Sequence, residues 1–221
     1  MLLALDTATH QAGIALYDGW RVVSEHAWHS QRRHTVELAS NVSRLLDQAG
    51  CAPSDVRAVA VALGPGSFTG LRVALGLAKG FALATGAALI GIPTLDVIAY
   101  PHQWQPLPVC AVVQAGRGRL CWAIYRREDG GWRTVTGYRL NTVAGVAEQI
   151  AEPMLFSGEL YEEQAGRLGE MLGERFVLAS PALRLRRPGV LAELAWRRWQ
   201  AGDVDDVATL SPIYLHEPAV R

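Results

Sequence analysis

The chain can be read outward from one glycine-rich turn, residues 63–72, with the sequence LGPGSFTGLR. The β-branched and apolar run Val56–Leu63 ahead of it is typical of a buried strand. The run Phe68–Thr85 behind it predicts a long helix. Glycines allow the sharp turn between the two, and Ser67 is placed to cap the helix. The segment therefore predicts a strand, a tight loop and a central helix.

The predicted helix is apolar on almost every side, since Arg72 and Lys79 are its only charged residues. A helix of that kind must be covered all round. The chain's own sheet supplies one cover, and the other is either a neighbouring helix or another protein. Composition leaves these two alternatives open.

Length and composition indicate a folded globular protein of one large domain or two small ones. Half of the 221 residues are hydrophobic and the formal net charge is zero, which argues against a dedicated electrostatic binder of nucleic acid or membrane surfaces. The three cysteines show neither metal nor redox spacing. The chain begins with a strand pattern rather than a leader, and Lys79 interrupts its longest uncharged run. We therefore expect a cytoplasmic protein without a membrane span.

A strand-rich pattern opens each half of the sequence. Three antiparallel strands are expected first, and a helix at His34–Ala49 follows them. The proline-rich segment 101–108 predicts a boundary. Beyond it, three further strands are expected at Val109–Val113, Leu120–Arg126 and Trp132–Leu140. We expect an α/β protein with an N-terminal lobe at residues 1–100, the boundary at 101–108 and a C-terminal lobe at 109–221.

Two segments could contact phosphate. The glycine turn matches neither the dinucleotide fingerprint nor the P-loop spacing, which favours a structural turn. Asp6 at a strand end resembles the first phosphate loop of the actin, hexokinase and Hsp70 superfamily, where an aspartate positions a metal-bound water; an Asp that organises its own turn is the alternative. The candidate phosphate contacts are Asp6, Thr7, Thr9, Gly64, Gly66, Ser67 and Thr69.

Other catalytic constellations are missing from the sequence. His34 lacks the second histidine one turn along its helix that metal sites use, so no metal site is expected. Ser67 has no identifiable base and the G-x-S-x-G elbow does not occur, which argues against a hydrolase. Arginine clusters near the C-terminus could touch RNA phosphate, although such clusters are more often solvated helix faces; they comprise Arg184, Arg186, Arg187, Arg197 and Arg198.

Four motifs together resemble the TsaB family, once called YeaZ. They are LALDTAT at 3–9, RHT at 33–35, GPGSFTGLR at 64–72 and GIPTL at 91–95, in the family's order and spacing. Pro212–Leu215 is similar to the family's closing segment. One departure stands out: the family usually carries Asp-Ala-Arg-x-Gly-Glu after the boundary, and this chain has QAGRGR at 114–119.

The resemblance implies a two-lobed actin/hexokinase/Hsp70-like (ribonuclease H-like) fold with mixed sheets and flanking helices. It implies a non-catalytic partner of the TsaD subunit, which transfers threonylcarbamoyl to the adenosine 3′ of the anticodon in tRNAs decoding ANN codons. It also implies TsaE as a third component, a homodimer when TsaD is absent, and contact with tRNA through the complex. No tightly bound cofactor is expected, and ATP or ADP at the complex interface stays open.

The resemblance further implies that the two N-terminal helices bind TsaD as a helical bundle. The expected interface residues are His34, Leu38, Val42, Leu45, Leu71, Arg72, Ala74, Leu75, Ala78 and Lys79. Two alternatives remain: an independent ATP-dependent phosphotransferase or ATPase that uses Asp6 and the glycine turn, and a glycoprotease, for which metal ligands and a nucleophile pair are lacking.

Overall fold

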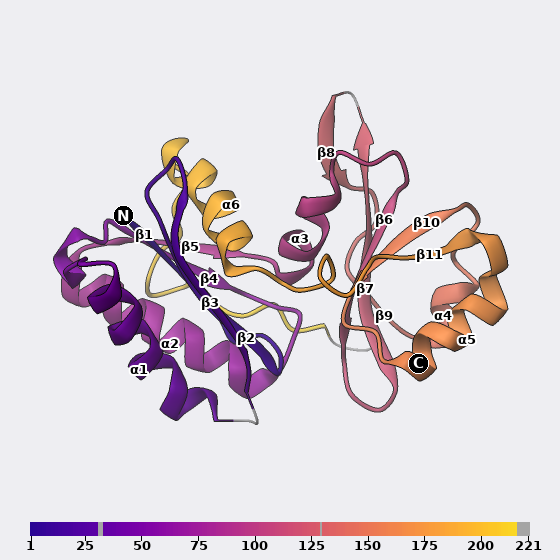
Figure 1. Cartoon of the computed structure of the whole chain (residues 1–221), viewed down its shortest axis with the longest axis horizontal. Coiled ribbons are helices and arrows are strands. Elements are labelled where there is room, and N and C mark those ends of the chain that lie inside the picture. The colour runs from indigo at the N-terminus through magenta and orange to yellow at the C-terminus, as the bar shows by residue number, and fades with distance from the viewer. Residues whose placement is uncertain (31–32, 129, 216–221) are drawn as a thin grey trace. The chain divides into compact units, whose positions relative to one another are not determined.

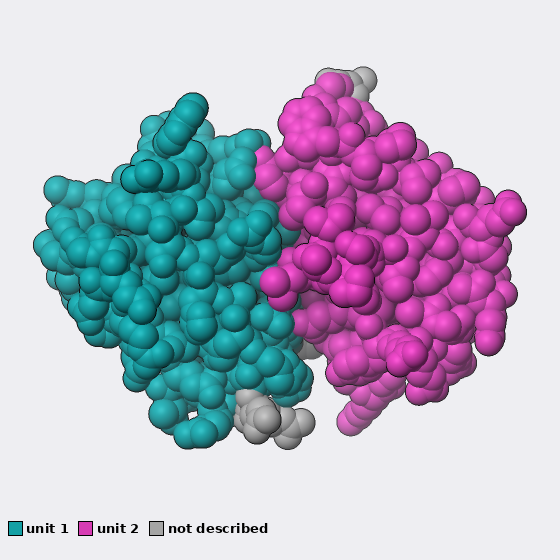
Figure 2. Space-filling view, viewed as in Figure 1, with its two compact units in different colours: residues 1–97, 186–213 teal, residues 98–185, 214–221 magenta. Residues whose placement is uncertain are grey.

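The computed structural model describes residues 1–30, 33–128 and 130–215. The chain divides into two compact units. Unit 1 comprises residues 1–97 and 186–213, and unit 2 comprises residues 98–185 and takes up the chain again from 214 (Figure 2). The units differ from the expected lobes in two respects: residues 186–213 return to unit 1, and residues 98–108, expected as the end of the first lobe and the boundary, belong to unit 2.

The sheet of unit 1 has five strands in the order β3-β2-β1-β4-β5. β1 pairs antiparallel with β2, which pairs antiparallel with β3, whereas β1, β4 and β5 run parallel to one another. The strands are β1 (Leu2–Asp6), β2 (Gln11–Tyr17), β3 (Val22–His29), β4 (Ala58–Ala62) and β5 (Ala88–Ile92).

Helices cover both faces of this sheet (Figure 1). Leu3 and Leu5 point into the cluster formed with α1 (His34–Gln48) and α2 (Phe68–Thr85). Their neighbours on β1 point the other way, into the cluster formed with α6 (Pro188–Gln200). Alternation along a strand thus separates two apolar layers. A short 3₁₀ turn, Pro53–Asp55, connects α1 to β4.

The return of α6 to unit 1 has a packing reason. Ala192 and Ala195 are fully buried against the sheet. At the start of the helix, a Cβ atom on Gly13 would lie 2.9 Å from Pro188 Cγ, so only glycine lets the helix come this close to β2. Small residues on α6 and on the sheet therefore allow the last helix to pack closely against the sheet of unit 1.

Unit 2 repeats the strand arrangement of unit 1. Its sheet runs β11-β10-β6-β7-β8, with β9 also paired to β7. β6 is antiparallel to β7 and parallel to β10, as β1 is to β2 and β4. The strands are β6 (Val109–Gln114), β7 (Arg119–Glu128), β8 (Gly131–Thr134), β9 (Arg139–Thr142), β10 (Met154–Gly158) and β11 (Phe176–Leu178).

The single strand expected at Trp132–Leu140 is wrong, because the chain forms two short strands, β8 and β9. Thr136 lies in the gap between them, where its hydroxyl accepts a hydrogen bond from Ile124 N at 2.9 Å. The remaining elements are α3 (Thr94–Ala99), α4 (Val143–Ala147), α5 (Glu162–Leu172) and 3₁₀ turns at Tyr100–His102 and Gly173–Arg175. Side chains from α4 and α5 fill the core against one face of the sheet.

Candidate functional site

Asp6 ends β1 and forms a buried ion pair with Arg186 from the other end of the chain. Both side chains are 2% exposed. Arg186 Nε donates to Asp6 Oδ2, and Arg186 Nη2 lies 3.2 Å from Asp6 Oδ1. Asp6 Oδ1 also accepts the backbone N–H of Ala8 at 2.9 Å, so the carboxylate organises its own turn.

The guanidinium of Arg186 continues into the hairpin between β1 and β2. Its Nη2 donates to Thr9 Oγ1 at 3.1 Å and to the carbonyl of Gln11 at 2.6 Å. A cation of the chain itself thus occupies the place that a metal or phosphate would take beside Asp6. A nucleotide-bound magnesium ion does not fit there, because the guanidinium would repel the dication in a site with little water.

The glycine turn packs directly against the same hairpin. A Cβ atom on Gly66 would lie 2.2 Å from Ala8 O, and one on Gly70 would lie 2.0 Å from Thr7 O. Thr7 Oγ1 donates to Gly70 O at 2.7 Å, and Ser67 N donates to Ala8 O. These glycines serve close backbone packing.

The remaining candidates in the turn divide by exposure. Gly64 is buried, with φ +106°, and its N–H donates to Thr94 Oγ1 at 3.1 Å. Ser67 caps α2 as predicted, accepting from Gly70 N at 3.3 Å. Ser67 and Thr69 are exposed, whereas Asp6, Thr7 and Thr9 are buried. The structure thus brings the predicted phosphate residues together but turns most of them toward one another.

Gln114, where the sequence departs from the family pattern, belongs to a network of side-chain amides in unit 2. Gln114 Nε2 donates to the carbonyl of Glu159 at 2.9 Å and contacts the side-chain amide of Gln164. Gln164 Oε1 accepts the backbone N–H of Tyr161 at 3.2 Å, at the start of α5. An aspartate at position 114 would meet these oxygen acceptors without a donor. The glutamine therefore holds β6 to the loop before α5.

A buried histidine–serine contact was not visible in the sequence. His102 Nε2 lies 2.8 Å from Ser157 Oγ, and both residues are buried. Burial lowers the pKa of His102, so the imidazole is neutral near pH 7. The two residues are far apart in sequence, and no motif marked either. Because Ser157 is fully buried, the contact joins the 3₁₀ turn at 100–102 to β10 rather than serving as a nucleophile pair.

Metal-site and membrane features are also missing from the part of the chain that the structure describes. Within residues 1–30, 33–128 and 130–215, no three His, Cys, Asp or Glu side chains gather as a metal site would require. None of the helices in these ranges combines the length and hydrophobicity needed to cross a bilayer.

Most of the residues expected to face a partner lie inside the chain's own core. His34, Leu38, Val42 and Leu45 of α1 are buried, and so are Leu71, Ala74, Leu75 and Ala78 of α2. Only Arg72 and Lys79 reach the surface; Lys79 Nζ donates to Ala208 O at 3.3 Å. The residue-level assignment needs this correction because the helices use these side chains to cover the sheet of unit 1.

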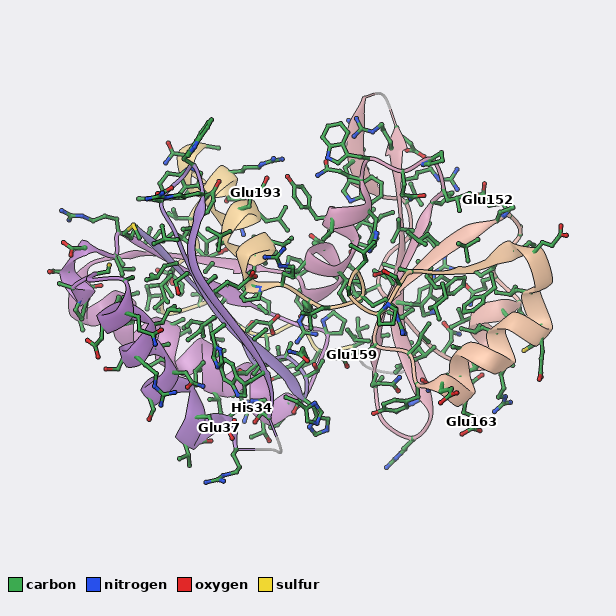
Figure 3. The ribbon with its side chains drawn as sticks, in the orientation of Figure 1. His34, Glu37, Glu152, Glu159, Glu163 and Glu193 are labelled. Atoms are coloured by element: carbon green, nitrogen blue, oxygen red, sulfur yellow. The ribbon has the colours of Figure 1, made fainter. Side chains whose placement is uncertain are left out.

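Figure 3 shows His34 beside Glu37 near the start of α1. The Nδ1 atom of His34 is buried and makes no hydrogen bond with the described residues. Glu37 Oε2 accepts the indole N–H of Trp28 at 2.9 Å, which ties α1 to β3. Burial lowers the pKa of His34.

The outer face of α1 and α2 carries a different set of residues. Val36, Phe68 and Leu83 are 65%, 54% and 74% exposed, and the guanidinium of Arg72 lies 3.8 Å from the ring centroid of Phe68. Gly76 and Gly80 lie between Arg72 and Leu83 along α2, and Cβ atoms added to these two glycines would meet nothing within 4 Å. Sequence reasoning missed this face because small and apolar residues surround α2, so periodicity did not show which side points outward.

Comparison with known proteins identifies the family. Residues 22–191 match a family model described as "TsaD: tRNA N6-adenosine threonylcarbamoyltransferase". The tRNA threonylcarbamoyladenosine biosynthesis protein TsaB of Haemophilus influenzae is 31% identical over 76% of this chain and 71% of that protein. The chain belongs to the TsaB family. TsaB of Bacillus subtilis is 28% identical over 97% of this chain and 93% of its own length.

Solved structures agree with the TsaB assignment. YeaZ from Pseudomonas aeruginosa matches with a TM-score of 0.80 and 29% identity, over 97% of this chain and 99% of that one. A ROK hexokinase from Thermus thermophilus matches with a TM-score of 0.53 and 12% identity, over 90% and 99% of the two chains. The second match shows the fold alone. The predicted actin/hexokinase/Hsp70-like fold is confirmed.

Proposed function

We propose that this TsaB family member is a non-catalytic subunit that acts by binding TsaD. In the complex, TsaD would transfer threonylcarbamoyl to the adenosine 3′ of the anticodon in tRNAs decoding ANN codons. The observation that carries the proposal is the outer face of α2, where Phe68 and Leu83 are exposed and where Gly76 and Gly80 are not required by the chain's own packing.

The exposed glycines are the strongest part of this argument. Glycine inside a helix costs about 1 kcal/mol relative to alanine. Gly76 and Gly80 stand one turn apart in α2, where side chains would meet nothing within 4 Å. A second helix whose backbone approaches closely would explain why both positions lack a side chain. Val36, Phe68 and Leu83 would then be buried along its edges.

The site at Asp6 supports a role without chemistry of its own. Its carboxylate is neutralised by Arg186 and enclosed, which argues against the alternative of an independent phosphotransferase. We therefore expect isolated chain and Mg-ATP to give no binding heat in calorimetry. Tight binding by the isolated chain would favour the phosphotransferase instead.

The subunit would act by population shift. If the outer face binds the competent conformation of TsaD more tightly than its other conformations, the conformational equilibrium of TsaD moves toward the competent one.

The same face would pair two copies of this chain when TsaD is absent, and TsaE would join the assembled complex. We expect ATP or ADP, if the complex holds it, at the subunit interface, since Ser67 and Thr69 are the candidate hydroxyls that stay exposed.

A charged variant tests the binding face. Gly76→Arg should leave the chain folded, because arginine favours a helix and finds open space there. It should abolish the complex with the TsaD homologue of the same genome, and with it threonylcarbamoyl transfer to tRNA in a reconstituted assay. Gly166→Arg is the matched control: Gly166 is an exposed glycine of α5, also with nothing within 4 Å of its Cβ position. Equal binding by both variants would contradict the proposed face.

A further inference from the structure

Unit 2 carries an exposed tryptophan with an arginine stacked on it. Trp104 is 80% exposed, and the guanidinium of Arg127 lies 4.5 Å from its ring centroid. Arg127 Nη2 also donates to the carbonyl of Gln103 at 3.2 Å, so the cation is held over the indole. The guanidinium thus covers one face of the indole ring, while most of the Trp104 side chain remains exposed to solvent.

The stack continues onto the β7–β8 hairpin. Arg127 of β7 pairs directly with Trp132 of β8, which places both side chains on one face of the hairpin. Trp132 in turn stacks on Tyr125 at 6.3 Å between ring centroids and 16° between ring planes. We name Trp104, Arg127 and Trp132 the tryptophan platform.

The loop that presents Trp104 is fixed by local hydrogen bonds. Gln103 N donates to Tyr100 O at 3.2 Å, and Gln105 N donates to His102 O at 3.3 Å. Gln105 Oε1 then accepts from Leu107 N at 2.8 Å. The indole is therefore held outward by an ordered turn, which lowers the entropy cost of stacking a ligand on it.

The positive charge of the platform is not cancelled by a carboxylate among the described residues. Arg126, on the opposite face, pairs with Glu128 and with Glu152, which Figure 3 labels. Arg127 bonds to backbone carbonyls. Arg133 lies directly across from Arg126 and therefore on the face away from the platform. Asp129, which follows Glu128 in the sequence, is outside the described residues.

Four of the five arginines that the sequence marked as possible RNA contacts form ion pairs elsewhere, and the exception is Arg184, whose Nε makes no hydrogen bond with the described residues. Arg186 is buried on Asp6, Arg187 pairs with Glu25, Arg197 with Glu193 and Arg198 with Asp203 and Asp205. An exposed indole with a guanidinium stacked on it is the chemistry that binds unstacked nucleobases and their phosphates.

We infer that the tryptophan platform binds single-stranded RNA, with one unpaired base stacked on Trp104 and a phosphate contacted by Arg127. The identification of the RNA as the loop of a tRNA rests on the proposed function. Trp104 and Arg127 bind the RNA and take no part in bond making. Unit 2 would thus hold substrate RNA while unit 1 binds TsaD.

Fluorescence anisotropy on the isolated full chain tests the inference. The probe is a fluorescein-labelled anticodon stem-loop RNA of an ANN-decoding tRNA, titrated at two salt concentrations. Trp104→Ala should weaken binding about tenfold or more, and Trp104→Phe should restore most of it, since an aromatic face suffices for stacking. Arg127→Ala should also lower the salt dependence, by about 0.7 in the log–log slope.

Trp20 supplies the matched control. It is 91% exposed in unit 1, but its neighbour Arg21 pairs with Asp18. Trp20→Ala should leave RNA affinity unchanged. The inference is overturned if the parent chain does not bind the probe, if Trp104→Ala and Trp20→Ala bind alike, or if Trp104→Ala weakens the TsaD complex instead of RNA binding. Because complex formation is measured separately by light scattering, failure of this inference is distinguishable from failure of the proposed function.

Discussion

At the residue scale, the buried ion pair between Asp6 and Arg186 is the feature of unit 1 that argues most directly against nucleotide chemistry at Asp6. In this chain a guanidinium, rather than a metal ion, balances the aspartate at the end of β1. Asp6 and its turn stood out in the sequence, because an acid followed by small hydroxyl residues is a recognisable pattern. Its partner did not, since Arg186 was one of several arginines in a basic segment and nothing in the spacing marked it for burial.

Removing one member of this pair should be costly. Arg186→Met leaves the Asp6 carboxylate buried without its cation, and we expect a loss of about 3–5 kcal/mol in the free energy of unfolding. The double variant with Asp6→Asn should recover much of that loss. Arg187→Met is the control, because its pair with Glu25 is more than half exposed on the arginine side and should contribute about 0–1 kcal/mol. Urea unfolding compares the parent, the two single variants at Asp6 and Arg186, their double variant and the Arg187→Met control. Additive effects at Asp6 and Arg186 would contradict a coupled pair.

Two histidines predict how stability depends on pH. Burial lowers the pKa of both His34 and His102. Below about pH 6.5, the unfolded chain therefore binds more protons than the folded chain. The free energy of unfolding then decreases as the pH is lowered, by up to about 1.4 kcal/mol per pH unit for each histidine. This contribution is fully present above the unfolded pKa. Urea unfolding between about pH 7.5 and 5 should show the fall, and His34→Asn or His102→Asn should flatten it. A flat profile in the parent would contradict the burial of neutral imidazoles.

At the scale of elements, α2 shows how far a sequence pattern reaches. The strand, turn, cap and helix around residues 63–85 were predicted, because β-branched runs, glycines and a capping serine act locally. The direction of the helix faces was not, because Ala74 and Gly76 look alike in a nearly uniform apolar run. The structure buries the first and exposes the second. Partner residues chosen without that distinction fell on the core side.

Glycines of α2 should therefore respond oppositely to alanine. Gly70→Ala places a Cβ 2.0 Å from Thr7 O and should cost about 3 kcal/mol, because the hairpin backbone cannot yield cheaply. Gly76→Ala meets nothing within 4 Å and should stabilise the isolated chain by about 0.5–1 kcal/mol. Thermal unfolding compares them directly. A destabilising Gly76→Ala would mean that this face is already packed within the chain.

At the scale of the whole molecule, the two units repeat one strand arrangement, which the sequence indicated by restarting a strand pattern after the proline-rich segment 101–108. The return of α6 to unit 1 was not predicted. Its docking depends on small residues such as Gly13 meeting Pro188 across a large sequence separation. Such contacts leave no periodic signal. Ser157 and His102 in unit 2 illustrate the same limit.

The central claim is that this chain works as a binding subunit for TsaD. Light scattering after size exclusion measures it most directly, with the chain mixed with the TsaD homologue of the same genome, with and without Mg-ATP. The account predicts one peak with the mass of a heteromer for the parent and for Gly166→Arg, and separate peaks for Gly76→Arg. Separate elution of the parent chain and the TsaD homologue under every condition would contradict it.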